Sequence, residues 1–287
     1  MFDGIVGHEK ELEAIKQLVS SGRSHAMLFV GPTGVGKRTI ARRLVSYIIK
    51  SEKLHTHPDV MTVFDDRSIA IDRIRELNSF ISRKPQIADK RIALIERAHR
   101  MAPLAADALL KTLEEPRGDR LIILTARHAS LLPETVVSRA SVISFNTLNN
   151  KIISDWLSSK FPEQKQEDRD HILFASCGSL GLAHLLSTDP EARESAEKSF
   201  SSAKAILTST APAKMRFAAE QFIGIKENEK KRQTAQELFS AIERALHSTV
   251  KEARFGITAG RALQNARADL AHNVAPQAVL EHLLLSL

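Results

Sequence analysis

The stretch Ala26–Lys37, AMLFVGPTGVGK, runs five apolar residues directly into a glycine-rich turn that ends in a lysine. The apolar run is typical of a buried strand, and Arg38–Lys50 carries the apolar spacing of a helix. Glycines at such a turn let backbone N–H groups point inward, so that they form an anion cradle where the helix begins. The order of strand, turn and helix predicts a phosphate-binding loop, the alternative being a glycine-rich turn without a ligand.

We expect this loop to bind ATP or ADP, with Lys37 reaching the outer phosphates. In phosphate loops the residue after the lysine gives a hydroxyl to Mg²⁺. Here that residue is Arg38, and the nearby hydroxyl of Thr39 lies about 100° further round the helix. The sequence therefore argues against Mg²⁺ at this loop. The candidate nucleotide-binding residues are Gly31, Thr33, Gly34, Val35, Gly36, Lys37, Arg38 and Thr39.

A second motif follows the predicted strand Arg91–Ile95. A hydrolysing ATPase needs an aspartate here for the metal and then a glutamate that orients water, but the chain has Glu96 and Arg97. Glu96 could still reach a magnesium ion, whereas the guanidinium of Arg97 stays protonated and cannot act as a base. We therefore expect ATP hydrolysis to be very slow or absent. Thr125, which ends the predicted strand Leu121–Thr125, stays open as a polar sensor residue.

The first half of the chain alternates short apolar runs with helical patterns, which predicts a parallel sheet with helices on both faces. Strand signals stop after about Phe145, and the remaining patterns are helical. Ser68 is predicted as the N-cap of a helix over residues 69–82. Three domains are expected: an α/β phosphate-loop domain over 1–147, a small helical lid over 148–189, and a helical domain over 190–287 that begins at Pro190.

Composition limits the function classes. Cys177 is the only cysteine, which excludes a disulfide or a four-cysteine zinc site within the chain, and its apolar surroundings predict a small core residue. We expect a cytoplasmic protein, because no signal-peptide pattern or membrane-spanning run is present. Most of the formal charge of +7 lies in residues 1–150, where 23 Lys and Arg face 17 Asp and Glu. That balance would favour a polyanion nearby, but scattered arginines usually form a solvated surface.

Three further blocks carry a resemblance: IDRIREL at Ile71–Leu77, AADALLKTLEEP at Ala105–Pro116 and LLPETVVSR at Leu131–Arg139. They resemble the bacterial DNA polymerase III clamp-loader subunits of the AAA+ class, most closely the delta-prime kind. The resemblance implies an AAA+ domain, a helical lid and a helical collar domain for oligomerisation. It also implies a hetero-pentameric ring with gamma or tau motor subunits and a delta subunit, which loads a sliding clamp onto primer-template DNA.

The resemblance assigns roles to individual residues. Ser138 and Arg139 fall on the family's Ser-Arg-Cys motif, whose arginine acts as a finger in the ATP site of a neighbouring subunit. Ala140 replaces the cysteine, and the alternative for Arg139 is a structural arginine at a strand entry. In the lid, Gly181 takes the position at which relatives carry an arginine that contacts the γ-phosphate.

Zinc is not expected. Many delta-prime subunits carry a four-cysteine zinc module before a His-Pro-Asp segment, and this chain has His57-Pro-Asp59 without those cysteines. His55 and His57 are interpreted as parts of a solvated loop, and His25 as a packed or hydrogen-bonded residue. We therefore predict a site without metal ligands.

These patterns favour a non-hydrolysing subunit of the DNA polymerase III holoenzyme that supplies Arg139 in trans. Two alternatives stay open. Glu96 with Thr39 could support weak ATP turnover, which would make the chain a motor subunit of the gamma or tau kind. The chain could instead be a nucleotide-sensing AAA+ module outside replication. No membrane partner is expected.

Overall fold

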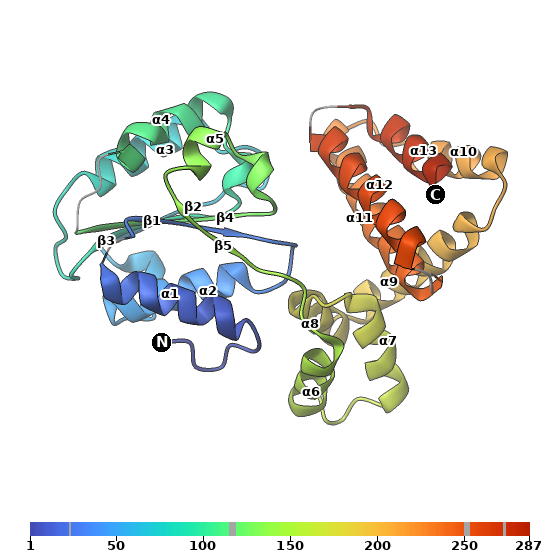
Figure 1. Ribbon diagram of the computed structural model, residues 1–287, viewed down its shortest axis with the longest axis horizontal. Coiled ribbons are helices and arrows are strands. Elements are labelled where there is room, and N and C mark those ends of the chain that lie inside the picture. The colour runs from blue at the N-terminus through green and yellow to red at the C-terminus, as the bar shows by residue number, and fades with distance from the viewer. Residues whose placement is uncertain (23, 115–118, 250–252, 272–273) are drawn as a thin grey trace. The chain divides into compact units, whose positions relative to one another are not determined.

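The computed structural model describes residues 1–22, 24–114, 119–249, 253–271 and 274–287 (Figure 1). Glu115 and Pro116, which end the block that begins at Ala105, lie outside the described residues. The chain divides into two compact units. The first comprises Met1–Lys160 with Gly178–Leu182, and the second Phe161–Cys177 with Ala183–Leu287. The three-domain division at residues 147 and 189 stays a prediction.

The first unit alternates strands with helices. Its longer elements are α1 (Glu9–Ser21), β1 (Ala26–Val30), α2 (Lys37–Ile49), β2 (Val60–Val63), α3 (Ile71–Ile81), β3 (Arg91–Ile95), α4 (Pro103–Glu114), β4 (Arg120–Ala126), α5 (Glu134–Val137), β5 (Ser141–Ser144) and α6 (Asn150–Lys160). Three single turns of 3-10 helix lie at Leu54–Thr56, Ala98–Arg100 and Ala129–Leu131.

The five strands form one parallel sheet in the order β2-β3-β4-β1-β5, which confirms the predicted sheet. β1 lies between β4 and β5, with Val30 opposite both Ala126 and Ser144. The carboxyl end of β1, where the phosphate loop begins, is therefore flanked by the ends of two other strands. In parallel α/β sheets ligands bind at this edge.

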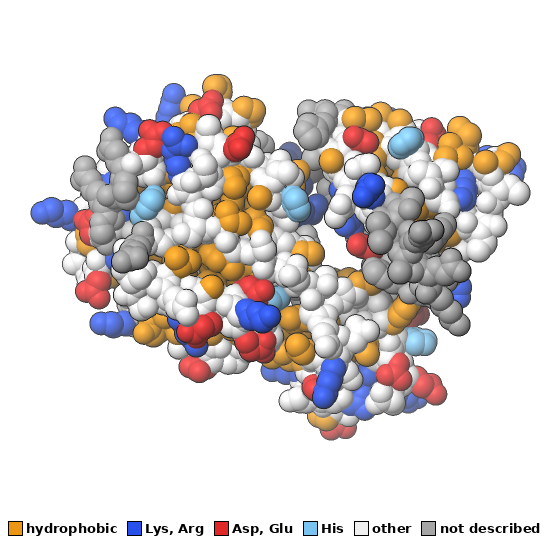
Figure 2. Space-filling view, in the orientation of Figure 1, with side chains coloured by type: hydrophobic (Ala, Val, Ile, Leu, Met, Phe, Trp, Pro, Cys, Tyr) orange, Lys and Arg blue, Asp and Glu red, His pale blue; other side chains and the backbone are white. Residues whose placement is uncertain are grey.

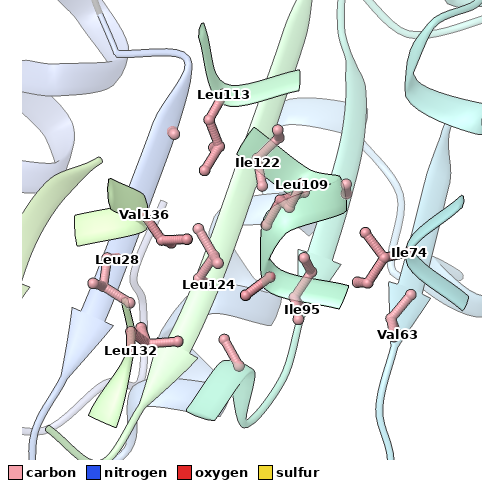
Figure 3. Close-up of a cluster of buried hydrophobic side chains, with 14 of the residues drawn as sticks. Leu28, Val63, Ile74, Ile95, Leu109, Leu113, Ile122, Leu124, Leu132 and Val136 are labelled. Carbon is pink, nitrogen blue, oxygen red and sulfur yellow. The ribbon is translucent and has the colours of Figure 1, made fainter. Parts of the chain in front are cut away.

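Helices cover both faces of the sheet, as predicted (Figure 1). On one face α1 and α2 pack against alternate residues such as Met27 and Phe29 of β1. On the other face α3, α4 and α5 cover the intervening residues. Figure 3 shows Leu28 of β1 beside Leu132 and Val136, and Leu124 of β4 between Val136 of α5 and Leu109 of α4. Because both faces are covered, β1, β3 and β4 are buried along their whole length and rigidly hold the loops that follow them.

The second unit is helical. Its helices are α7 (Gln166–Ser176), α8 (Leu180–Thr188, from Ala183 on), α9 (Pro190–Leu207), α10 (Ala211–Glu220), α11 (Asn228–Thr249), α12 (Ala253–Ala271) and α13 (Pro276–Ser286). Pro190 begins α9 as predicted, and the Asp189 side chain caps it by accepting the Ala192 N–H at 3.0 Å. Phe239 of α11 and Leu280 of α13 lie in the core of this unit. None of the described helices has the length and apolarity needed to cross a bilayer.

Two sequence predictions were wrong in detail. The N-cap of α3 is Ala70, and the Ser68 backbone N–H instead donates to the Asp65 carboxylate at 3.2 Å. Cys177 is half-buried and not a core residue: it is the C-cap of α7, in a left-handed conformation with φ 45°, and Phe174 of the same apolar stretch is exposed. The sequence analysis interpreted the scattered arginines as a solvated surface. Figure 2 agrees with this, because positive and negative side chains are interspersed over the visible face.

Candidate functional site

The glycine-rich turn has the backbone conformation that an anion cradle requires. Gly31, Gly34 and Gly36 have φ values of 145°, 81° and 104°, which side-chain-bearing residues rarely adopt. At Gly31 a Cβ atom would lie 2.1 Å from the backbone oxygen of Phe145, so the turn also needs glycine for lack of space. The buried Val35 anchors the turn, since its carbonyl lies 2.8 Å from Nε2 of His8. The loop can therefore present its N–H groups to a phosphate chain.

Lys37 is folded back onto the loop. Its amine donates to the carbonyls of Gly31 and Pro32, both at 2.6 Å. Burial, together with the positive charge of Arg127, lowers the pKa of Lys37 to about 8. An incoming phosphate would favour the charged amine and give it a stronger partner than the two carbonyls.

The two positions that hold Mg²⁺ in hydrolysing phosphate-loop ATPases form an ion pair with each other here. Glu96 follows β3 directly, and its side chain is only 2% exposed. Nε of Arg38 lies 2.6 Å from one carboxylate oxygen of Glu96, and Nε of Arg42 lies 2.8 Å from the other. Arg42 is four residues beyond Arg38, so both reach from one face of α2. Sequence reasoning missed Arg42, although this helical spacing was visible.

Arg97 is also held away from the role of a base. It has the unusual φ of 55°, and its backbone N–H donates to the Thr125 hydroxyl oxygen at 3.0 Å. Its guanidinium pairs with Asp66 and lies 5.2 Å from the ring centre of Phe64, while the Arg38 guanidinium lies 5.1 Å from the same ring. Asp66 and Phe64 carried no sequence signal, because they follow β2 without a motif. The sensor role of Thr125 stays a prediction.

The residues present do not fit magnesium. Among the described residues no group of three His, Cys, Asp or Glu side chains could hold a metal ion. Mg²⁺ needs oxygen ligands in octahedral order, yet both oxygens of Glu96 face guanidinium groups, which cannot ligate a cation. Thr39 is exposed on α2, and Arg38 stands where the hydroxyl ligand would be. The glycine-rich loop has the geometry to bind a phosphate group, whereas the positions that would bind the metal do not.

The segment Gly178–Leu182 lies on the phosphate loop within the first unit. The Gly181 N–H donates to the Gly34 carbonyl at 2.8 Å, and the Ser179 hydroxyl donates to the Thr33 carbonyl at 3.3 Å. A Cβ atom at Gly181 would lie 3.0 Å from the oxygen and 3.1 Å from the Cα of Gly34. The missing lid arginine therefore has a steric reason, because the backbone occupies the space that its stem would need.

We predict that Gly181→Ala lowers stability by about 1–3 kcal/mol, because the added methyl group would crowd the backbone of Gly34, which would have to move. The matched control is Gly260→Ala in α12, where nothing lies within 4 Å of an added Cβ. That control should instead stabilise by about 0.4–1 kcal/mol. Calorimetric Tm values of the two variants give the comparison, and equal shifts would contradict the close approach at Gly181.

Arg139 lies after α5 and contacts α4 and α5. Its side chain is 34% exposed, and its Nη2 forms an ion pair with Glu114 at 2.6 Å. Its Nη1 donates to the Thr135 carbonyl at 2.9 Å, to which the Ser138 hydroxyl also donates at 3.3 Å. The guanidinium is thus oriented by local contacts and still reaches solvent. Its assignment as a finger stays a prediction.

The histidines have ordinary roles. His25 lies 2.9 Å through Nε2 from the Leu113 carbonyl, as the prediction of a hydrogen-bonded residue requires. His57 accepts the backbone N–H of Asp59 through Nδ1 at 3.1 Å, and His55 is exposed. These contacts give His25 and His57 structural roles, and His55 is a surface residue.

Residues 7–149 match the family model described as DNA polymerase III, delta subunit. The chain is 30% identical over 175 residues to the DNA polymerase III subunit delta' of Pseudomonas aeruginosa. This alignment covers 54% of this chain and 53% of the relative. It is 29% identical over 174 residues to the same subunit of Haemophilus influenzae, covering 55% and 52%. The match thus spans about half the length of these curated relatives.

A solved structure supports the fold. A DNA polymerase III gamma subunit-related protein from Thermotoga maritima aligns with 96% of this chain and 97% of its own, with a TM-score of 0.51. Its sequence identity is 20%, so this likeness supports the fold alone. The chain therefore shares the fold of that structure, in agreement with the predicted AAA+ fold class.

Proposed function

Because the chain belongs, through residues 7–149, to the DNA polymerase III clamp-loader family, we propose that it is a delta-prime-like ring subunit that does not hydrolyse ATP. In this role it supplies Arg139 to the ATP site of a neighbouring motor subunit. The ring, with gamma or tau and delta subunits, loads a sliding clamp onto primer-template DNA.

One observation supports the proposal that the chain does not hydrolyse ATP. Glu96 is buried between Arg38 and Arg42, and Arg97 stands where a base would orient the attacking water. Phosphoryl transfer depends on a positioned nucleophile and on charge stabilisation by metal and cations. The site offers cations without a base or a metal ligand. ATP that entered it would meet no group able to activate water.

The chemistry of Arg139 supports the second half of the proposal. A guanidinium stays charged and presents a planar fork that matches phosphate oxygens. Arg139 already holds one carboxylate, that of Glu114, at 2.6 Å on a partly exposed surface. A phosphate of the ATP bound in a neighbouring subunit could take the place of this carboxylate with the same geometry of contact. Surface ion pairs of this kind are weak enough to exchange.

We predict that the purified chain shows background ATPase turnover at saturating ATP, with and without DNA. Mixed with motor and delta subunits of the same organism, it should form a pentamer whose ATP hydrolysis is stimulated by primed DNA. Size-exclusion chromatography with light scattering and a coupled phosphate assay measure both. Turnover by the chain alone at the rate of a motor subunit would sink the non-hydrolysing role. Failure to form any complex would point to a sensing module outside replication.

A further inference from the structure

The Gly178–Leu182 segment holds two successive carbonyls of the phosphate loop. The Thr33 carbonyl accepts the Ser179 hydroxyl at 3.3 Å. The next carbonyl, that of Gly34, accepts the Gly181 N–H at 2.8 Å. The approach is close, because a Cβ atom at Gly34 would lie 2.2 Å from Oγ of Ser179. The segment therefore fixes the direction of both carbonyls.

His8 holds the third carbonyl of this run. Its Nε2 atom lies 2.8 Å from the oxygen of Val35. Because a carbonyl oxygen can only accept, this nitrogen carries the hydrogen and donates it. The side chain has little freedom to turn away, since His8 is 7% exposed and its ring packs edge-on against Phe145 with 5.1 Å between the ring centres. The direction of the Val35 carbonyl is therefore fixed as well.

The direction of these three carbonyls determines that of the N–H groups that follow them. In a trans peptide the C=O and N–H bonds of one plane point in opposite directions. The N–H groups of Gly34, Val35 and Gly36 are therefore directed away from the residues that hold the carbonyls. Within the described ranges, the N–H groups of Gly34 and Gly36 donate to no other group of the chain. Successive N–H groups arranged in this way form a nest that binds anions.

We propose that His8, Ser179 and Gly181 are positioning residues that keep the phosphate loop in its anion-binding form before a nucleotide arrives. A phosphate group then meets N–H donors that are already oriented, and binding is tighter because the loop need not be ordered at that moment. This inference rests on the phosphate loop of the proposed delta-prime-like subunit. It does not depend on Arg139 or on ring assembly.

The Gly178–Leu182 segment thus acts on the phosphate loop without an arginine. Ser179 directly precedes α8, and its Oγ accepts the Leu182 N–H at 3.2 Å, so it also caps this helix. The Gly181 N–H belongs to the first turn of α8, whose N–H groups have no partner within a helix, and the Gly34 carbonyl supplies one. The loop and the first turn of α8 therefore order each other.

The test is calorimetric titration of the full chain with ADP, starting with two variants at His8. His8→Leu removes the donor to the Val35 carbonyl and should weaken ADP binding by about tenfold or more. His8→Gln keeps an amide N–H at the same number of bonds from Cα, so its Kd should lie within about threefold of the wild-type value. Both variants lose the ring contact with Phe145, and they differ mainly in the donor.

His25→Leu is the matched control for His8→Leu. His25 makes a contact of the same kind, with Nε2 2.9 Å from the Leu113 carbonyl, but it precedes β1 at the opposite end from the phosphate loop. This control should lower the Tm and leave the Kd for ADP unchanged. If His8→Leu also lowers the Tm without changing the Kd, His8 has a structural role only.

A variant at Ser179 tests the other side of the loop, even if His8→Leu does not fold. Ser179→Ala removes the hydroxyl that holds the Thr33 carbonyl and should weaken ADP binding by about threefold or more. Ser187→Ala removes a hydroxyl that donates to the Ala183 carbonyl within α8, at 2.8 Å, and should leave the Kd unchanged.

Three results would each overturn the inference: an unchanged Kd for Ser179→Ala, no recovery of binding by His8→Gln, or no binding of ADP by the wild-type chain. None of them would remove the proposed function. The absence of hydrolysis, the assembly of the ring and the effect of Arg139 are measured separately.

Discussion

Replacement of Arg139 by alanine is expected to lower the DNA-stimulated ATP hydrolysis of a reconstituted ring on the order of a hundredfold or more. The effect arises in the neighbouring motor subunit, where a positive charge offsets the negative charge that develops on the transferred phosphoryl group. The variant should still assemble, because the side chain is partly exposed and its contacts are local to Glu114 and Thr135. The measurement is the rate of phosphate release by purified rings of verified size.

Two control variants show whether the guanidinium itself is needed. Arg139→Lys keeps the charge and loses the planar fork, so it should recover only part of the rate. Arg73→Ala removes an exposed arginine from α3 and should leave the rate unchanged. Full activity of Arg139→Ala in an intact ring would show that Arg139 is a structural arginine. In that case its pair with Glu114 would be its whole role.

The strands were predictable to the extent that they are buried on both faces. Residues 92–95 and Ala26–Val30 are continuous apolar stretches, because helices cover both faces of the sheet. The sequence analysis gave no bounds for the edge strand β5, since only Ile143 of its four residues is buried. Phe64 lies just beyond β2, is 38% exposed and stands beside two arginines, so its apolar character does not mark a buried strand residue.

The candidate site divides in the same way. The phosphate loop was readable because its three glycines lie within six residues of the chain and each meets a local backbone requirement. The ion pair of Arg38 with Glu96 was not, because it joins α2 to the end of β3 and neither residue carries a signal for the other. Considered separately, Arg38 and Glu96 are each interpreted as the loss of a metal ligand. In space they form one charged arrangement that explains why both differ together from the hydrolysing pattern.

The second large effect concerns Asp59, which precedes β2 and is fully buried. Its carboxylate accepts the backbone N–H groups of Gln86 at 2.7 Å, Ile87 at 2.7 Å and Ala88 at 2.9 Å. One of its oxygens lies 3.4 Å from Nη2 of Arg91, which is also buried. The carboxylate thus connects the loop before β3 to the start of β2. It also offsets the positive charge of Arg91.

Asp59→Asn is expected to lower the free energy of unfolding by about 3–5 kcal/mol, because it leaves the buried Arg91 charge without its partner and turns an amide toward backbone donors. Asp72→Asn is the matched control, since its carboxylate is 78% exposed and pairs with Arg75 on the surface of α3. Its cost should be about 0–1 kcal/mol. Urea denaturation followed by circular dichroism measures both, and similar costs would contradict the buried role of Asp59.

The dependence on pH identifies the charge as the cause. Burial raises the pKa of Asp59, but the hydrogen bonds from Ala88, Ile87 and Gln86 and the charge of Arg91 outweigh it, so the pKa is lowered overall. The stability contributed by a carboxylate with a lowered pKa is fully present above its ordinary value of about 4 and is lost as the pH falls through the folded-state pKa. Asparagine does not titrate, so the difference in unfolding free energy between the wild-type chain and Asp59→Asn should be constant near neutrality and shrink in acid. A difference that stays constant down to the acid transition would mean that shape, and not charge, is what this position contributes.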